Sequence, residues 1–547
     1  MAKKTKKPSA DSKHADLPPG EDESLAAQAA AAAAQAAAFS NEETKQRAAP
    51  AQGTALTGFK LFVQAFRVEL MLFGVVFLVL LMFSGQRFWR QSAAPHFVYQ
   101  SKAWLEGRID LDAETLPNFE DWACVHEVDG VKSRCERGRV SSQDRWYSSF
   151  PPFPSVVMLP FVMVNGYQLN DTSFGVIIAA LGIALFYSLL RLLREHEGTQ
   201  LALGDNVTLA LLLAFGTVFF YSSLRGEVWF SAEVMGVGFT ALYVRNSVRA
   251  RRPVLAGLFW SMAVLTRTPL FFTGLFFVFE AIAPDKGSRL EQFKNVMKNE
   301  KAKRALFQFA AAAAPLGLTA AFVNKLRFGS FTEFGHRFLY DNRVNPDIDT
   351  FGLFHPHYLE RNLDAAFLKL PMLDHARLLY TPWGLSLFLT LPFLALAFVP
   401  ATAHKRVWGA LGAMAAVLVG SSLFPSQAAV GERPAAVVLI LAATLGLLVW
   451  FAWQWVSDPA SPRLLVPLLL TLVACAGPGL LYQNTGYAQF GFRFSIDYAP
   501  YVMLLVAIGG WNFRKPLAMA VALVAVIVNF WGAIGFRGYT ESVRNWL

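Results

Sequence analysis

The sequence predicts an all-α, polytopic membrane protein built as a bundle of spanning helices. Hydrophobic residues make up 54% of the 547 positions, a larger share than is typical of soluble domains, and mean hydropathy is +0.37. Apolar runs close to membrane-spanning length recur along most of the chain. In lipid, only helices or closed barrels satisfy the backbone, and barrel strands alternate in polarity. Because these runs are continuous, a helical bundle is favoured over a barrel.

Residues 1–55 are predicted to form a disordered cytoplasmic tail, followed by one transmembrane domain over residues 56–547. The tail begins with a cluster of lysines and contains an Ala/Gln-rich run at residues 26–38, a composition that cannot bury a core. The first apolar run begins near residue 68, too far along the chain for a cleavable signal peptide. We therefore predict that this run is a membrane anchor.

About thirteen spans are predicted from the length of the apolar runs and the charge of the loops. They cover residues 68–84, 174–190, 207–221, 228–244, 254–265, 270–283, 305–323, 385–399, 407–423, 436–451, 464–480, 501–508 and 518–534. This arrangement places the Lys- and Arg-rich loops and the tail in the cytoplasm, and the C-terminus outside. The short apolar run at residues 153–165 is then predicted to lie at the interface without crossing. The net charge of +10 therefore does not indicate nucleic-acid binding.

Two long polar loops and a third, shorter segment are predicted on the outer face. Loop 1 covers residues 86–172, loop 2 covers residues 324–381, and the third segment, residues 482–498, contains NTGYAQFGFRFSID. Both loops are longer than ordinary connectors and are expected to carry interfacial helices, one of them at residues 96–105. Polar side chains beside lipid are costly, so their convergence on one face predicts a functional site.

Loop 1 contains the candidate acid–base residues. His96 can serve as a base near neutral pH, although a plain helix-capping role fits its position equally well. Asp121 is the second candidate base. Asp110 and Asp112 form an Asp-x-Asp pair, and residues 347–349 of loop 2 form another. Such pairs can hold a divalent metal but are common without one, so a metal stays an open alternative and no cofactor is predicted.

The three cysteines divide into a pair in loop 1 and a single residue in an apolar run. Cys124 and Cys135 are eleven positions apart and can form a disulfide if the loop lies outside the cytoplasm. Cys475 is predicted to be a small core residue. The predicted topology therefore allows one disulfide.

Arginines in loop 2 and in segment 482–498 are candidate phosphate ligands. A guanidinium group binds phosphate through two parallel hydrogen bonds, which favours Arg337, Arg361 and Arg493 as ligands of an anionic headgroup. Arg493 can instead pair along a helix with Asp497, four positions later. The sequence contains no nucleotide-binding loop, nucleophile elbow or zinc-protease motif. These residues therefore indicate a membrane-embedded substrate with an anionic head.

Several sequence blocks resemble a known family when they are taken in order. Loop 1 reads HFVYQSKAWLEGRIDL, DWA and YSSFPPFPSVVMLPF, and later blocks read FGSFTEFGHRFL, GLFHPHYLERNL, TPWGLSLFLTLPFL and QFGFRFSIDYAPYVMLL. Over residues 68–508 the chain resembles the GT-C superfamily of integral-membrane glycosyltransferases. Within it, the chain is most similar to the bacterial branch of protein O-mannosyltransferases and lipid A aminoarabinose transferases. The resemblance implies a GT-C-like fold, a bacterial inner membrane and a polyprenyl-phosphate sugar donor.

The resemblance also implies where the catalytic base lies. The family places an acidic residue in the first outer loop, just past the first span. This chain has His96 at that place, with Tyr99 beside it as a further substrate contact. Asp121, Asp110 and Asp112 are therefore alternative bases.

The resemblance further implies a second acid at the outer end of a later span, a place that Glu227 fits, with Glu233 in reserve. It assigns the donor phosphate to the three arginines named above. The predicted function is transfer of a sugar from a polyprenyl-phosphate carrier to a hydroxyl or lipid acceptor on the outer face. The alternative is a transporter or flippase of lipid-linked sugars.

Overall fold

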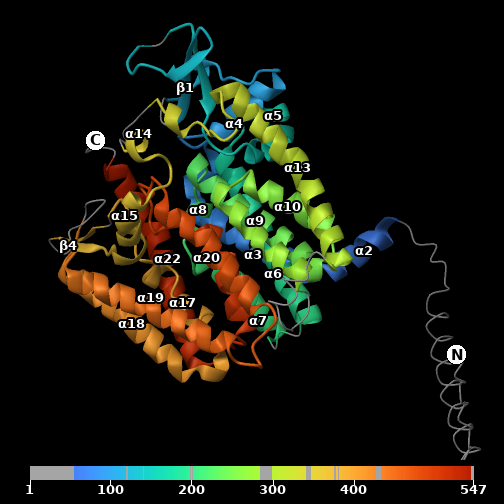
Figure 1. The fold of residues 1–547 in the computed structure, drawn as a ribbon, viewed down its shortest axis with the longest axis vertical. Helices are drawn as coiled ribbons and strands as arrows, with labels where there is room; N and C mark the ends of the chain where they lie inside the picture. The colour runs from blue at the N-terminus through green and yellow to red at the C-terminus, as the bar shows by residue number, and fades with distance from the viewer. Residues whose placement is uncertain are drawn as a thin grey trace, which may run out of the picture. The chain divides into compact units, whose positions relative to one another are not determined.

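The computed structural model of the chain describes residues 55–118, 121–139, 141–197, 199, 201–283, 298–340, 347–374, 377–379, 381–426 and 433–543. These residues belong to two compact units, Met1–Arg67 and Val68–Leu547. Helix α2 (Ala55–Ala65) is in the first unit, and residues 1–54 of the predicted tail lie outside the described residues. The second unit contains all the elements discussed below (Figure 1).

The second unit consists mainly of helices, with short strands in its two long loops. The helices are α3 (Arg67–Ser84), α4 (His96–Leu105), α5 (Phe153–Asn165), α6 (Asp171–Glu197), α7 (Leu203–Phe215), α8 (Phe219–Ser223), α9 (Val228–Ser247), α10 (Pro253–Val264), α11 (Gly274–Ile282), α13 (Glu300–Phe328), α14 (Ile348–Phe351), α15 (Leu359–Leu363), α16 (Leu387–Thr390), α17 (Leu394–Ala397), α18 (Lys405–Leu423), α19 (Ala435–Val456), α20 (Leu465–Leu481), α21 (Ala499–Ile508) and α22 (Pro516–Val543). The strands are β1 (Trp122–Val128), β2 (Val131–Arg134), β3 (Asp144–Ser148), β4 (Met372–Asp374) and β5 (Arg377–Leu379). The main apolar core lies among α6, α7, α9, α20, α21 and α22.

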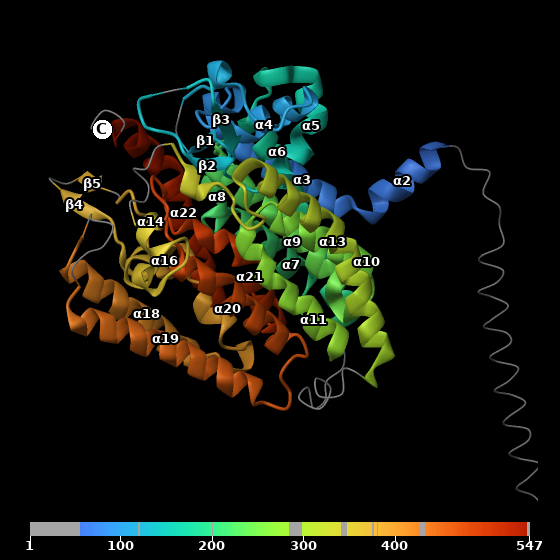
Figure 2. The ribbon, with the colours of Figure 1, turned by 45° about the horizontal axis from the view of Figure 1, so that its top comes forward.

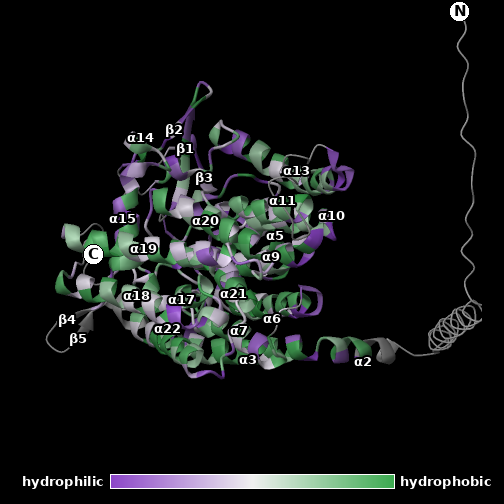
Figure 3. Cartoon of the chain, turned by 60° about the horizontal axis from the view of Figure 1, so that its bottom comes forward, coloured by the Kyte–Doolittle hydropathy of each residue, from purple (hydrophilic) through white to green (hydrophobic). Residues whose placement is uncertain are grey.

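Six helical segments among the described residues are long and apolar enough to cross a membrane. They are Arg67–Trp89, Asp171–Glu197, Glu300–Phe328, Lys405–Leu423, Ala435–Val456 and Pro516–Phe536. Helices α18 and α19 lie side by side (Figure 2). Large apolar side chains on this pair, such as Trp408, Val449 and Trp453, are exposed. Much of the helical ribbon in Figure 3 has the colour of hydrophobic residues. Since an apolar exterior of this extent is stable only against lipid, the chain is a helical membrane protein.

The predicted spans coincide with helices except where the chain interrupts them. The span expected at residues 385–399 is instead two four-residue helices, α16 and α17, separated by Leu391 and Pro392. Leu391 has φ −139° and ψ 55°, because the proline ring disfavours the α conformation in the residue before it. The predicted spans at residues 254–265 and 270–283 are separated by Arg267, whose backbone is also extended. Among the described residues, six helices are long and apolar enough to span a membrane, so the expected count of thirteen spans is not confirmed.

Loop 1 contains both predicted helices, α4 and α5, and a three-stranded antiparallel sheet that the sequence prediction missed. The strands lie in the order β2-β1-β3. The turn between β1 and β2 is Asp129-Gly130, in which both residues have positive φ, 51° and 76°. Asp-Gly between two short apolar-polar runs is a strong hairpin signal, and it was present in the sequence.

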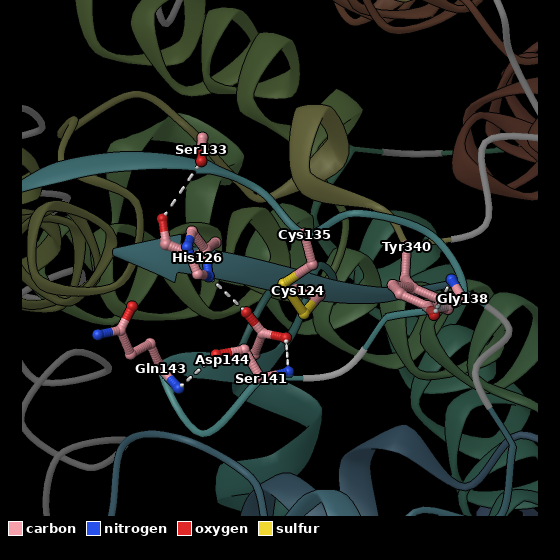
Figure 4. Close-up of a disulfide and its surroundings, with 9 residues drawn as sticks. All are labelled: Cys124, His126, Ser133, Cys135, Gly138, Ser141, Gln143, Asp144 and Tyr340. Carbon is pink, nitrogen blue, oxygen red and sulfur yellow. Dashed lines mark hydrogen bonds and ion pairs between the residues drawn. A yellow bond between two sulfur atoms is a disulfide. The ribbon is translucent and has the colours of Figure 1, made fainter. Parts of the chain in front are cut away.

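A disulfide joins Cys124 of β1 to Cys135, the residue after β2, with 5.5 Å between the two Cα atoms. This confirms the pairing that the sequence allowed. Figure 4 shows the disulfide beside the ion pair between His126 and Asp144, whose Nδ1 and Oδ1 atoms are 2.7 Å apart. The disulfide therefore fixes the edge strand β2 to the central strand of the sheet.

Loop 1, loop 2 and segment 482–498 meet at one end of the helices, which we call the loop end. The backbone N–H of Tyr340 in loop 2 donates to the carbonyl of Trp122 in β1 over 3.0 Å. The N–H of Gln483 donates to the carbonyl of Leu353 over 2.9 Å, so loop 2 also pairs with the third segment. The predicted convergence of the three segments is therefore confirmed.

Replacement of both Cys124 and Cys135 by alanine should loosen the sheet of loop 1. A cross-link that closes a loop of this length stabilises by about 3 kcal/mol in the chain-entropy account. Hydrogen exchange at the amides of β1 and β2 should then accelerate by roughly 100-fold, as measured by mass spectrometry. The variant Cys475→Ala, in buried helix α20, is the control and should leave this exchange unchanged. Equal protection in the double variant and the wild type would contradict the role of the disulfide.

Candidate functional site

The first turns of α9 bring loop 1 to the helical core. Trp229 and Glu233 are four residues apart on α9, so their side chains lie on one face of the helix. The indole Nε1 of Trp229 donates to Oδ2 of Asp121 over 2.8 Å. Asp121, the residue before β1, has a positive φ of 57°. The strand therefore delivers the predicted base to the same helix face as Glu233.

Four charged side chains meet beside this face and form what we call the charge quartet, Glu233, Arg267, Arg493 and Asp497. Arg267 binds Asp497 through two hydrogen bonds, Nε to Oδ1 at 3.0 Å and Nη2 to Oδ2 at 2.7 Å. Oε1 of Glu233 lies 3.2 Å from Nε of Arg493 and 3.6 Å from Nη2 of Arg267. The quartet therefore joins α9 to the break before η5 (Thr268–Thr273) and to η12 (Arg493–Asp497).

The backbone explains why these side chains can converge. Arg267 lies in the sequence Thr-Arg-Thr-Pro, and its extended backbone, with φ of −145° and ψ of 112°, separates α10 from η5. Residues 493–497 form a single 3-10 turn in place of a regular α-helix. Arg493 and Asp497 therefore bind different partners, and the alternative of an ion pair between them along a helix is not what the structure contains.

The quartet is buried and carries no net charge. The exposed fractions of its side chains are 0% for Glu233, 2% for Asp497, 8% for Arg493 and 17% for Arg267. Neither carboxylate oxygen of Glu233 accepts a hydrogen bond of good geometry within the described residues. Burying charges in an apolar surround is costly even when they are paired, so such a group in a membrane protein is a functional-site candidate.

Aromatic rings surround the two arginines. The guanidinium carbon of Arg493 lies 5.3 Å from the ring centres of Phe230 and of Phe494, and that of Arg267 lies 5.6 Å from Phe494. Such contacts favour a cation that has lost part of its water shell. Burial raises the pKa of Tyr482, beside the quartet, to about 12, so its hydroxyl stays protonated at neutral pH. The site therefore offers two cations and a neutral hydroxyl in a dry setting.

Of the predicted base residues, Asp121 contacts α9 beside the quartet. His96 instead contacts Trp122, the residue that follows Asp121. The ring of His96 is fully buried and stacks on Trp122 with 3.6 Å between the ring centres. Tyr99 packs on the same Trp122 ring at 6.1 Å. His96 and Tyr99 therefore support the segment that carries Asp121, whereas Asp121 itself contacts α9.

Glu227 lies near the quartet but has its own partner. Its carboxylate accepts two hydrogen bonds from Arg225, at 3.0 and 2.7 Å. Arg225 lies 5.5 Å from the ring centre of Phe230, the same ring that Arg493 contacts. Glu233, the reserve candidate for the second acid, is the one that reaches the two arginines.

The remaining predicted site residues take part in contacts within the loops. Arg361 donates a hydrogen bond to the carbonyl of Gln483, the residue that follows Tyr482 in the chain. It therefore holds the segment that carries Tyr482. The side chain of Arg337 is 59% exposed, with Glu333 4.0 Å away. Asp110 pairs with Arg145 over 3.0 Å, and Asp112 accepts the N–H of Glu114 as a helix cap.

The acidic and sulfur groups that suggest metal binding have other partners. Asp349 lies 3.4 Å from Arg134, and Asp347 lies 3.6 Å from His357. Cys124, Cys135 and Asp144 come within 4.8 Å of one another, but the two sulfur atoms are bonded in the disulfide and offer no thiolate (Figure 4). The two sulfur atoms are therefore not available as thiolate ligands.

Loss of one partner of the Arg267–Asp497 pair should destabilise the protein far more than loss of an exposed pair. Asp497→Asn leaves the quartet with two buried guanidinium groups and one carboxylate, and an uncompensated buried charge costs about 3–5 kcal/mol. Asp110→Asn, in the exposed pair with Arg145, should cost roughly 0–1 kcal/mol. Thermal unfolding of the detergent-solubilised protein, followed by tryptophan fluorescence, compares the two.

The double variant Arg267→Met with Asp497→Leu completes this test. Because it removes both charges together, it should recover much of the midpoint temperature that Asp497→Asn loses. Equal losses for the buried and the exposed single variants would show that the quartet is not a dry ion-pair site.

Comparison with known proteins gives no family for this chain. No protein-family model, no curated protein and no solved structure matches it.

Proposed function

We propose that the chain is a membrane glycosyltransferase of the GT-C type, which moves a sugar from a polyprenyl-phosphate carrier to a hydroxyl or lipid acceptor. One observation carries the proposal. Asp121 of loop 1 binds Trp229 on the face of α9 from which Glu233 reaches the two buried arginines. A carboxylate base and a cationic phosphate site are the two groups that this transfer requires. The hydrophobic exterior of the helices suits the polyprenyl chain of such a donor.

In the proposed reaction the quartet holds the donor and Asp121 activates the acceptor. Arg493 and Arg267 bind the phosphodiester, which carries one negative charge, and stabilise the second negative charge that develops on the phosphate oxygen as it leaves. The carboxylate of Asp121 takes the proton of the acceptor hydroxyl. A bond forms between the acceptor oxygen and the anomeric carbon, and the bond from that carbon to the phosphate oxygen breaks. Polyprenyl phosphate then leaves, and attack from the opposite face inverts the anomeric configuration.

The hydrogen bond from Trp229 gives Asp121 a defined orientation. The indole N–H donates to Oδ2 over 2.8 Å and so fixes how the carboxylate is turned against α9. Because Trp229 and Glu233 share one face of α9, the same helix contacts both Asp121 and the two arginines.

The proposal includes the orientation in the membrane. The loop end faces the periplasm of a bacterial inner membrane, the tail lies in the cytoplasm, and the shorter and interrupted helices complete about thirteen crossings. An outer location is supported by the disulfide in loop 1, since disulfides persist in oxidising compartments.

A transporter of lipid-linked sugars is the second candidate, because charged clusters lie at both ends of α9. At the end opposite to Glu233, Arg463 binds Glu280 at 2.7 Å and Glu197 at 2.9 Å. Arg249, just after α9, binds Glu197 at 2.8 Å. Two ion-pair clusters at opposite ends of one bundle can act as alternating gates. Release of a lipid-linked sugar trapped in vesicles, without any transfer, would favour this candidate.

Asp121→Asn should abolish sugar transfer. Loss of a general base lowers turnover by about 10²–10⁴-fold, and the amide keeps the size of the side chain. Purified protein incubated with a series of polyprenyl-phosphate sugars and membrane lipid extract, with product detected by mass spectrometry, gives the rate.

Asp110→Asn is the matched control for this test, because Asp110 lies in the same loop and pairs only with exposed Arg145 among its described contacts. The control should keep most of the wild-type rate. An unchanged rate in Asp121→Asn, or no turnover of any donor by the wild type, would contradict the proposed reaction.

A further inference from the structure

Glu233 is the least anchored charge of the quartet. Asp497 receives two hydrogen bonds from Arg267, whereas Glu233 is held only by ion pairs, 3.2 Å from Arg493 and 3.6 Å from Arg267. Its side chain is fully buried, and among the described residues neither oxygen has a hydrogen bond of good geometry. Within that part of the chain, the two arginines are therefore the counter-charges of Glu233.

An anionic headgroup at the arginines would compete with Glu233 for them. With Glu233 ionised, the two cations and two carboxylates already balance, so one further negative charge leaves the buried site with an excess. A like charge within about 4–6 Å favours the protonated form of a carboxyl group. Glu233 would experience this effect most, because Asp497 keeps its two bonds to Arg267.

We propose that Glu233 takes up one proton when a phosphodiester headgroup binds to Arg267 and Arg493, so that anion binding and proton uptake are coupled. The inference rests on the proposed function in taking the quartet as the headgroup site. The direction of the pH dependence follows from linkage, because the complex holds one more proton than the free protein. Affinity for the anion is therefore highest at low pH and falls as pH rises. Release of the headgroup returns the proton.

Other titratable groups around α9 are tied to partners of their own. Asp121 accepts a hydrogen bond from Trp229, and Glu227 binds Arg225. Burial raises the pKa of Tyr482 to about 12 and lowers that of His336, which packs on Tyr482, to about 4. The groups facing this part of α9 are Asp121, Asp171, Tyr221, Arg225, Glu227, Arg267, Cys475, Tyr482, Arg493 and Asp497.

Isothermal titration calorimetry with farnesyl methyl phosphate tests the coupling. This phosphodiester keeps a charge of −1 across the neutral range, so any titration belongs to the protein. The full-length wild type in detergent is titrated at several pH values, each in two buffers of different ionisation enthalpy. We expect uptake of about one proton per anion, and a Kd that rises about tenfold per pH unit above the pKa of Glu233.

Glu233→Gln mimics the protonated carboxyl group and should bind the probe with an affinity that no longer depends on pH. Glu106→Gln is the matched control, since Glu106 is an exposed carboxylate of loop 1 that pairs with Lys102 and Arg108. It should retain the pH dependence of the wild type. The buffer comparison on the wild type stands by itself if Glu233→Gln fails to fold.

The outcomes separate this inference from the proposed function. Binding of the probe without proton uptake, or a pH dependence that persists in Glu233→Gln, overturns the coupling and leaves the headgroup site intact. No binding of the probe at any pH overturns the headgroup site and the coupling together. Proton uptake that Glu233→Gln abolishes supports both.

Discussion

The bidentate ion pair between Arg267 and Asp497 is the interaction on which the loop end depends. These residues are 230 positions apart in the chain. Arg267 lies between α10 and η5, and Asp497 lies in η12, between α20 and α21. Removing one partner would leave an uncompensated charge in an apolar surround, which is far more costly than the pair itself. The pair therefore fixes the break before η5 against η12, and the contact of Arg493 with Glu233 extends this constraint to α9.

A second set of ion pairs constrains the opposite end of the same helices. Arg463, before α20, binds Glu197 at the end of α6 and Glu280 in α11, while Arg249 follows α9. With both ends of α9 held in this way, large movements of the helix would break several buried ion pairs at once. Changes at the site on ligand binding are therefore expected in side chains and protonation states, which is the kind of change proposed for Glu233.

Local features were predictable from the sequence, whereas the site depends on distant pairings. Helices 96–105 and 153–165 follow from apolar pattern and proline placement, and both end where expected. The hairpin at Asp129-Gly130 was not predicted, although its turn signal is present in the sequence. The spacing of Arg493 and Asp497 predicts an ion pair along a helix, but these residues form a 3-10 turn. Asp497 binds the distant Arg267, and Arg493 binds Glu233. Likewise, the sequence favours Glu227 over Glu233 as the second acid, but Glu227 binds the nearby Arg225 and Glu233 is the one that reaches the two distant arginines.

The conformation of Asp121 connects the loop 1 sheet to the chemistry proposed for it. A positive φ is unfavourable for residues other than glycine, although aspartate tolerates it better than most, and such residues are enriched at functional sites. Two contacts offset this cost, the bond from Trp229 and the stacking of the next residue, Trp122, on His96. Because the disulfide and the pairing with loop 2 hold β1 in place, the turn before it can remain in this conformation. The sheet thus acts as the rigid support that an acid–base residue needs when it lies on a loop, beyond the end of any helix.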